Sequence, residues 1–187
     1  RNISESEFSC DGNVSIQFTS VPDIHCGTEV LYGHGNADVP PVITYADATP
    51  DLFYTVIIVD RDARSPDSPT LSPIIHYIGT NITGSQLTAG FNISSATDVS
   101  RFLSYRPPRP PSVGGCHRYY VMLYAQSNEL TPFIDVAVTG SFNWNFPSWA
   151  ATQNLSKLAV NYFVTKHPDS DSACTAPTPA PCPAPPK

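Results

Sequence analysis

The stretch LFYTVIIVDRDARSPDSP, residues 52–69, decides the fold class of this chain. Its first eight residues are almost continuously apolar and rich in β-branched side chains, which is typical of a central strand covered on both faces. The apolar run ends at Asp60, and the segment 61–73 that follows is rich in Pro, Ser and Asp, a composition that favours a loop. The sequence therefore predicts a buried strand that leads into acidic side chains and a long loop.

Further β-type runs lie before and after this strand. Two of them are dense enough to form core strands, IIHYIGTNI at 74–82 and RYYVMLYAQ at 118–126. Shorter or weaker strands are expected at 14–18, 29–33, 42–45, 136–143 and 161–165. The segment 83–117 contains a proline cluster and is predicted to be a long loop. Long loops between rigid strands are common places for ligand sites.

One helix is expected, at about 147–159. Pro147 suits a first helical turn, and Trp149, Leu155 and Leu158 would share an inward stripe. Because many short strands accompany this single helix, the predicted fold is mostly β.

The C-terminal end differs in composition from the rest of the chain. From Cys174 onward the sequence is CTAPTPAPCPAPPK, with six prolines in fourteen residues. Prolines at this density neither pair in a sheet nor continue a helix, so a polyproline-II-like tail is expected. The predicted organisation is a β domain at 1–170 and a Pro-rich tail at 171–187. The tail is interpreted as a passive spacer, with a partner-binding motif as the alternative.

Size and charge exclude several classes of protein. A chain of 187 residues is long enough to bury the core of one domain. The net charge of −6 argues against a nucleic-acid-binding protein, because such domains usually carry a basic stripe. No apolar stretch reaches the roughly 18 residues that a transmembrane helix needs.

Cysteines and glycosylation sequons point to an extracellular protein. The disulfide candidates are Cys10, Cys26, Cys116, Cys174 and Cys182. Their number is odd, and two bridges among them allow 15 arrangements, between which the sequence does not choose. Asn-x-Ser/Thr sequons occur at Asn2, Asn13, Asn81, Asn92 and Asn154. We expect a secreted glycoprotein, given in mature form because no signal peptide begins at Arg1; a Ser/Thr-rich cytosolic protein is the alternative.

Polar side chains gather at the ends of the predicted core strands. Asp60 closes the first strand, His76 lies inside the second, and His117 and Tyr119 open the third. Since residues two apart share a face of a strand, Asp60 and Asp62 are expected to project together, as are His117 and Tyr119. By the same rule His76 shares a face with Ile74 and Ile78, and Tyr77 faces away. A core histidine and a turn aspartate are the alternatives to a ligand site.

These segments resemble the phosphatidylethanolamine-binding protein family. The matching pieces are YTVIIVDRDARSPDSP at 54–69, IIHYIGTNI at 74–82 and GGCHRYYVMLYAQ at 114–126. The family carries an aspartate-rich segment after a core strand, a histidine in the next strand and a Gly-x-His-Arg-Tyr segment that opens a third. The resemblance covers residues 14–165 and implies a large antiparallel or mixed sheet packed on a smaller one, with one C-terminal helix.

The resemblance also implies a small anion pocket at the sheet edge. Asp60, His76 and Tyr119 would match the family's pocket residues, and His117 a histidine at its rim or just behind it. Pro110 and Pro111 would belong to the loop that borders the pocket. A phosphate needs donors, which a Tyr hydroxyl and an imidazole N–H supply. The carboxylate of Asp60 would then orient His76, bind an ammonium group or be protonated itself.

This chain departs from the family pattern at four positions. Two family prolines are replaced by Arg61 and Arg64, which either strengthen anion binding or lie in solvent. Ile74 stands where the family often has an aromatic wall. Cys116 stands at an often apolar position and is expected to be a buried, inert thiol, with a bridge to Cys174 or Cys182 as the alternative.

The function predicted is a secreted binding protein for a small anionic or phospholipid-headgroup ligand. The alternative is an extracellular protein-interaction module, such as a serine protease inhibitor or a signalling modulator, with a protein partner. An enzyme is not expected, since no G-x-S-x-G, H-E-x-x-H or P-loop motif occurs. No cofactor and no metal site are expected either.

Overall fold

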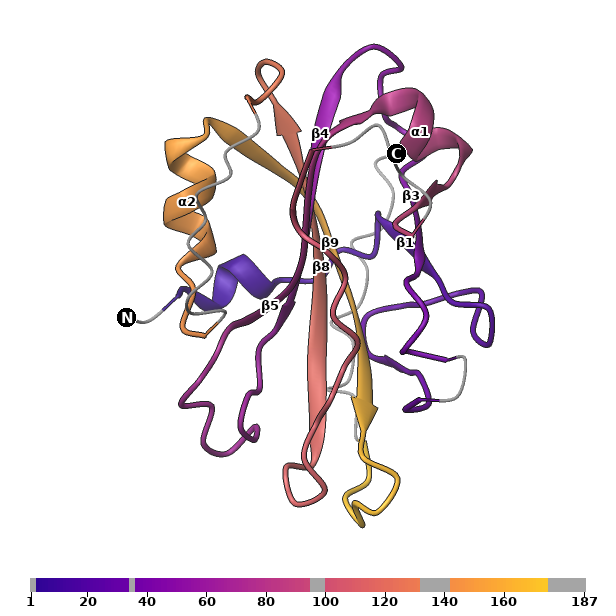
Figure 1. Cartoon of the computed structure of the whole chain (residues 1–187), viewed down its shortest axis with the longest axis vertical. Coiled ribbons are helices and arrows are strands. Elements are labelled where there is room, and N and C mark those ends of the chain that lie inside the picture. Colours follow the sequence, from indigo (N-terminus) through magenta and orange to yellow (C-terminus); the bar gives the residue numbers. More distant parts are fainter. Residues whose placement is uncertain (1–2, 34–35, 95–99, 132–141, 175–187) are drawn as a thin grey trace, which may run out of the picture.

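The computed structural model describes residues 3–33, 36–94, 100–131 and 142–174. Within them, two β-sheets pack face to face (Figure 1). The six strands of the large sheet are, in spatial order, β2 (Thr28–Glu29), β9 (Leu155–Lys166), β8 (Cys116–Gln126), β4 (Phe53–Asp60), β5 (Ile74–Thr83) and β7 (Ser100–Leu103). The three strands of the small sheet are β1 (Ser15–Gln17), β3 (Val42–Thr44) and β6 (Phe91–Asn92).

The large sheet is mixed, since β2 runs parallel to β9 while the other neighbouring strands are antiparallel. The prediction of a mostly β fold with a large mixed sheet on a smaller one is therefore confirmed. The three core strands also lie where the apolar runs place them, with β4 between β8 and β5.

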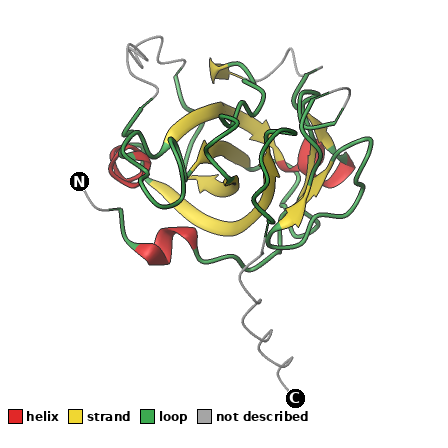
Figure 2. Cartoon of the chain, turned by 90° about the horizontal axis from the view of Figure 1, so that it is seen from below, coloured by secondary structure: helices red, strands yellow, loops and turns green. Residues whose placement is uncertain are grey.

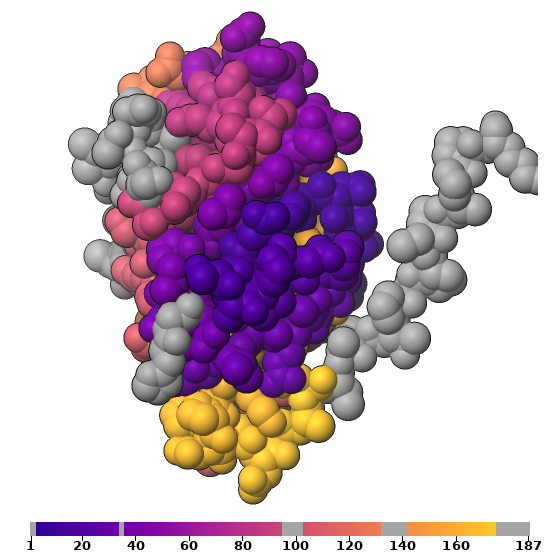
Figure 3. Space-filling view, turned by 90° about the vertical axis from the view of Figure 1, so that its right-hand side faces the viewer, coloured from indigo at the N-terminus to yellow at the C-terminus, as the bar shows by residue number. Residues whose placement is uncertain are grey.

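Both faces of β4 are buried, as its apolar run predicts. Val56 and Ile58 pack between the two sheets, in a cluster that includes Ile43 of the small sheet. Ile57 and Val59 pack on the opposite face, against the layer of the 3₁₀ helix η1 (Glu5–Phe8) and the helix α2 (Phe146–Thr152). Figure 2 shows these helices outside the curved large sheet. Figure 3 shows the other side, where residues from the first half of the chain cover the large sheet.

The predicted helix at 147–159 is wrong in its second half. The helix α2 begins beside Pro147 as expected, but it ends at Thr152, and β9 starts at Leu155. The reason is the long antiparallel pairing of β9 with β8, which buries Val160, Tyr162 and Val164 and outweighs the local helical pattern.

The segment 83–117 is less irregular than expected. It contains the short helix α1 (Gly84–Ala89), which Thr83 and Gln86 begin with a reciprocal capping box, and the strands β6 and β7. Among the helices in the described part of the chain, only α2 reaches seven residues. The strand expected at 29–33 is shorter, since β2 ends at Glu29. Most of the strand expected at 136–143 lies outside the described residues.

A β-bulge in β5 breaks the alternation expected around His76. Val59 pairs with Ile75 but Ile58 pairs with Tyr77, so His76 is the extra residue. As a result Ile75 and Ile78 lie on one face of the sheet, while Tyr77 lies in the core between the two sheets. The expectation that Ile78 and His76 share a face while Tyr77 faces away is therefore wrong.

Two disulfides join distant segments, Cys10 to Cys26 and Cys116 to Cys174. The preferred interpretation of Cys116 as a free, buried thiol is wrong, and the alternative of a bridge to Cys174 holds. Cys182 lies outside the described residues, as does the tail from 175 onward.

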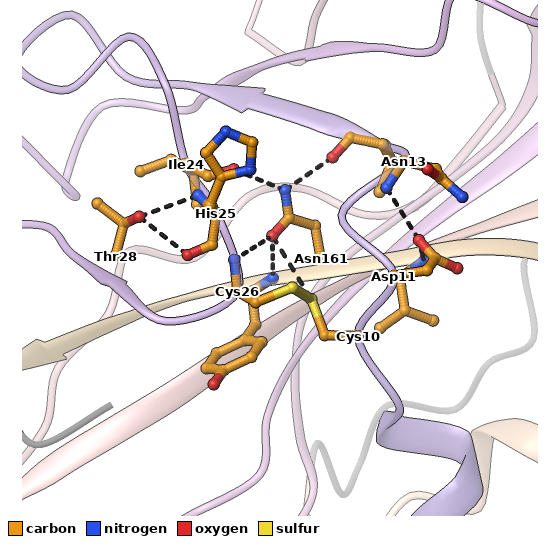
Figure 4. Close-up of a disulfide and its surroundings, with 11 residues drawn as sticks. Cys10, Asp11, Asn13, Ile24, His25, Cys26, Thr28 and Asn161 are labelled. Carbon is orange, nitrogen blue, oxygen red and sulfur yellow. Dashed lines mark hydrogen bonds between the residues drawn. A yellow bond between two sulfur atoms is a disulfide. The ribbon is translucent and has the colours of Figure 1, made fainter. Parts of the chain in front are cut away.

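Beside the first bridge, the fully buried amide of Asn161 ties the N-terminal segment to β9 (Figure 4). It donates to the carbonyls of Val14 and Ile24, both at 2.8 Å, and accepts from the N–H groups of Cys26 and Tyr162.

Candidate functional site

A buried ion pair forms where β4 ends beside β8. Asp60 pairs with Tyr119 across the ladder, and this register brings its carboxylate to the neighbouring side chain of His117, at 2.8 Å from Nδ1. The other ring nitrogen of His117 lies 3.1 Å from the carbonyl oxygen of Arg64. A carbonyl and a carboxylate only accept hydrogen bonds, so both ring nitrogens must carry a hydrogen. The geometry therefore assigns His117 as an imidazolium paired with the Asp60 carboxylate.

The environment of His117 agrees with this assignment. Its side chain is 2% exposed and that of Asp60 is 5% exposed. Burial by itself lowers the pKa of His117, but the hydrogen bond and the negative charge of Asp60 outweigh burial, so the pKa is raised. The Asp60 carboxylate therefore favours the protonated form of His117.

A second ion pair holds the start of the loop in place. The carboxylate of Asp62 accepts three hydrogen bonds from Arg118: from Nε at 2.7 Å, from Nη2 at 2.6 Å and from the backbone N–H at 2.8 Å. The backbone N–H of Asp62 in turn donates to Asp60. The two aspartates are therefore linked, but their carboxylates bind different cations.

Tyr119 and His76 lie behind this pair, within the core. The Tyr119 ring stacks on Phe163 at 5.2 Å and meets the edge of the His76 ring at 5.1 Å. Its hydroxyl is buried and forms no well-directed hydrogen bond within the described residues, while burial and the nearby Asp60 charge raise its pKa well above the usual value. His76 bonds through Nδ1 to the carbonyl oxygen of Arg106, and burial lowers its pKa, so it is neutral.

A pocket of about 500 Å³ opens directly above the ion pair. Asp60 and His117 form its buried end, and the exposed side chains of Arg64 and Arg109 lie at its rim. Its walls are mainly apolar and consist of Ala63, Leu71, Ile74, Pro111 and Val113. The pocket thus combines a neutralised polar floor, apolar walls and two cations at the mouth.

The structure brings together only some of the predicted site residues. Four of them line the pocket: Asp60, His117, Arg64 and Pro111. His76, Tyr119 and Pro110 are buried and do not line it.

Arg61 faces the other side of the loop, where its side chain pairs with Glu5 and lies 4.4 Å above the ring of Phe8. There it lines a different hollow, of about 710 Å³.

Arg109 is the charged pocket residue that sequence reasoning did not identify. It lies in the run PPRPP at 107–111, of which only the last two prolines were considered. Its guanidinium donates to the carbonyl of Pro108 and lies 5.7 Å from the ring of Tyr32. The sequence feature that could have indicated Arg109 is a single charged residue within a proline run, since prolines restrict the backbone that carries it.

In the described ranges, no three His, Cys, Asp or Glu side chains lie close enough together to hold a metal ion. In the same ranges, no helix is long and apolar enough to cross a membrane.

The fold is a two-sheet β scaffold with a pocket at the end of β4 and β8. The family model described as phosphatidylethanolamine-binding protein matches residues 3–174. The chain belongs to this family, as the resemblance implied.

Three proteins are similar to this chain in sequence or in fold. The rice (Oryza sativa subsp. japonica) protein "MOTHER of FT and TFL1 homolog 2" is 33% identical over 131 residues, which are 68% of this chain and 67% of the rice protein. A carboxypeptidase Y inhibitor, solved in complex with its cognate proteinase, is similar in fold with a TM-score of 0.64, at 18% identity and with 86% of each chain covered. The phosphatidylethanolamine-binding protein from Plasmodium vivax has a TM-score of 0.62 at 15% identity, with 82% of this chain and 84% of that chain covered.

Proposed function

We propose that this protein is an extracellular binding protein for a small anionic ligand of the phospholipid-headgroup type. The observation that carries the proposal is the pocket, in which the Asp60–His117 ion pair forms the floor and Arg64 and Arg109 lie at the rim. Because Asp60 is neutralised by His117, its carboxylate does not repel an anion as a free carboxylate would. The two arginines then give the mouth of the pocket a net positive charge.

The side chains that line the pocket indicate which class of ligand it would bind. Guanidinium groups bind phosphate and carboxylate oxygens through paired N–H donors. The apolar side chains of Leu71, Ile74 and Val113 offer contact to carbon atoms next to that anionic group. A phosphate monoester or headgroup with a short apolar portion satisfies both requirements.

The two disulfides support the proposed extracellular location. Bridges of this kind persist in oxidising compartments and are rare in the cytosol. One bridge joins Cys10, near the N-terminus, to Cys26. The other joins Cys174, after β9, to Cys116 at the start of β8. The five sequons are compatible with the same location.

A binding role suits the protonation state of the site better than catalysis does. General base catalysis needs an unprotonated imidazole nitrogen, and both nitrogens of His117 already donate to Asp60 and to the Arg64 carbonyl. We therefore propose no reaction and no cofactor for this site.

One observation favours a second candidate function, that of a protein-interaction module such as a serine protease inhibitor. The similar carboxypeptidase Y inhibitor was solved in complex with its cognate proteinase. Such a partner would contact the protein surface, and its binding would survive substitutions inside the pocket.

Arginine substitutions test the proposed ligand site. We expect phosphorylethanolamine or inorganic phosphate to raise the melting temperature of the wild type by mass action. Arg64→Gln and Arg109→Gln should each weaken binding roughly tenfold, or about 1.4 kcal/mol, because each removes a charge-assisted contact. Arg61→Gln is the matched control, since Arg61 lies in the same loop but outside the pocket. Calorimetric affinities that are equal for all three variants would contradict the proposal.

A further inference from the structure

The five sequons are a sequence feature that the proposed pocket does not use. Asn2 lies outside the described residues, and the other four differ sharply in burial. N-linked glycosylation attaches a sugar to the side-chain amide nitrogen, so that nitrogen must face solvent in the folded protein. The following inference rests on the proposed extracellular location, because the modification belongs to the secretory route.

The side chain of Asn81 is part of a buried polar network. Asn81 is only 7% exposed, and its amide nitrogen donates to the carbonyl oxygen of Leu130 at 2.7 Å. Its amide oxygen accepts from Gln126 and from the Leu130 N–H, both at 2.8 Å. The Gln126 side chain also accepts from the hydroxyl of Thr55 and from the Asn81 N–H. A sugar on Asn81 has no space here and would break this network.

The remaining three sequon asparagines are exposed. Asn13 precedes β1, and Figure 4 shows its side chain directed away from Asn161 and the disulfide. Asn92 ends β6, where its amide oxygen accepts from both the N–H and the hydroxyl of Ser94. Asn154 lies in the turn between α2 and β9, with a φ of 53°. In all three the amide lies at the surface, where a glycan needs no rearrangement of the core.

We propose that the folded, secreted protein carries N-linked glycans at Asn13, Asn92 and Asn154 and none at Asn81. Chains that receive a sugar at Asn81 during synthesis do not reach this fold, so the secreted fraction is depleted of them. Burial decides which of these four asparagines is glycosylated, since all four carry a sequon.

The three exposed sites leave the pocket end of the molecule bare. Along the β8–β9 ladder, Leu155 pairs with Gln126 at one end and Thr165 pairs with His117 at the other. Ten residues of strand separate Asn154 from the pocket end by about 30 Å. The segment of α1 and β6 also lies at the end opposite to residues 167–174, as Figures 1 and 3 show. Asn13 lies beside the middle of the β8–β9 ladder, because the backbone N–H of its neighbour Gly12 donates to the carbonyl of Val160. Ligands and partners therefore approach the pocket without meeting a glycan from Asn13, Asn92 or Asn154.

Site-by-site occupancy tests this assignment. The full chain is secreted from a eukaryotic cell line and treated with peptide N-glycosidase F in ¹⁸O-labelled water, which marks each formerly glycosylated asparagine for peptide mass spectrometry. We expect the label at Asn13, Asn92 and Asn154 and unmodified Asn81 in the monomeric secreted fraction. Label at Asn81 in that fraction would overturn the proposal, and so would the absence of label at the three exposed sites.

Two variants provide matched controls on gel mobility. Ser156→Ala destroys the sequon of Asn154 at an exposed position and should remove one glycan. Asn81→Gln should remove none, and retention of this variant in the cell would itself show that the Asn81 network is needed for folding. These outcomes are independent of the pocket, because failure of phosphorylethanolamine to bind would leave the glycan map unchanged. An unglycosylated but phosphate-binding protein would instead contradict only the glycan assignment and the extracellular location.

Discussion

Two buried polar clusters on the large sheet differ in their chemistry. The Asn161 cluster is neutral, and one side chain satisfies four backbone groups with hydrogen bonds. The Asp60–His117 cluster is charged, borders the Tyr119 hydroxyl, which has no well-directed partner in the described residues, and opens onto a pocket. Both join segments that lie far apart in the sequence, and both are nearly inaccessible to solvent.

The difference separates a structural role from a ligand site. A neutral, fully bonded amide fixes the path of the chain at low cost, because no charge leaves water. A buried ion pair loses much of its attraction to desolvation, so it is a weak device for stability alone. Its position at the floor of a pocket favours a role in binding.

The largest effect is expected for Asn161→Ala. The substitution leaves the carbonyls of Val14 and Ile24 and two N–H groups buried without partners, at about 1 kcal/mol or more for each. We expect the free energy of unfolding to fall by at least about 4 kcal/mol in chemical denaturation. Asn161→Asp keeps the acceptor but turns a buried carboxylate oxygen toward the carbonyls of Val14 and Ile24, so it should be at least as destabilising as Asn161→Ala. A loss below about 1 kcal/mol would show that the cluster does not hold the fold together.

An intermediate, pH-dependent effect is expected for His117→Gln. Glutamine can still donate one hydrogen bond to Asp60, but it removes the positive charge, which should cost about 3 kcal/mol at low pH. Because the folded-state pKa of His117 is raised above its unfolded value of about 6.5, this stabilisation is fully present below about pH 6.5. It is lost as the pH rises through the folded-state pKa.

The measurement is the difference in free energy of unfolding between wild type and His117→Gln over a pH series. His76 has a lowered pKa and therefore acts in the opposite sense, with stability lost as the pH falls through its folded-state pKa. The charge of His117 is the smallest cause of this lowered pKa, so the His76 contribution differs only by that one cause between the two proteins. A difference that grows with rising pH would contradict the imidazolium assignment.

The smallest effect is expected for Tyr119→Phe. The hydroxyl that it removes has no well-directed partner in the described residues, so stability should change by less than about 0.5 kcal/mol or rise slightly. Tyr105→Phe is the matched comparison, because the Tyr105 hydroxyl donates to the Ala37 carbonyl at 2.7 Å. That variant should lose about 1 kcal/mol in the same denaturation assay. Equal losses would indicate that the Tyr119 hydroxyl is satisfied by a bound water or ligand.

Much of the fold follows from local sequence patterns. The apolar runs at 52–59, 74–82 and 118–126 predict the three central strands, because strands buried on both faces need uninterrupted apolar side chains. The Pro-rich segment after Asp60 predicts the loop that borders the pocket. The family resemblance implies that Asp60 and Tyr119 belong to one site, and Asp60 does pair with Tyr119 across the ladder. The histidine that the Asp60 carboxylate contacts is His117, where His76 was expected.

Other features depend on contacts between distant segments. The boundary between α2 and β9 is one, since residues after Thr152 extend only because β8 offers a pairing edge. The bulge at His76 is another, because it arises from the register between β4 and β5. The choice among the disulfide arrangements likewise requires the distances between strands.

The sequence by itself thus determined the central strands, the loop and the residue types of the site, because burial patterns and turn preferences depend on residues that are close together in the sequence. Only the tertiary structure decided which charges face the pocket. Arg61 and Arg64 are three residues apart in one loop, yet Arg61 is drawn to Glu5 and Phe8 while Arg64 lines the pocket with Arg109. The partner that fixes each guanidinium comes from a remote part of the chain, and no local pattern specifies it.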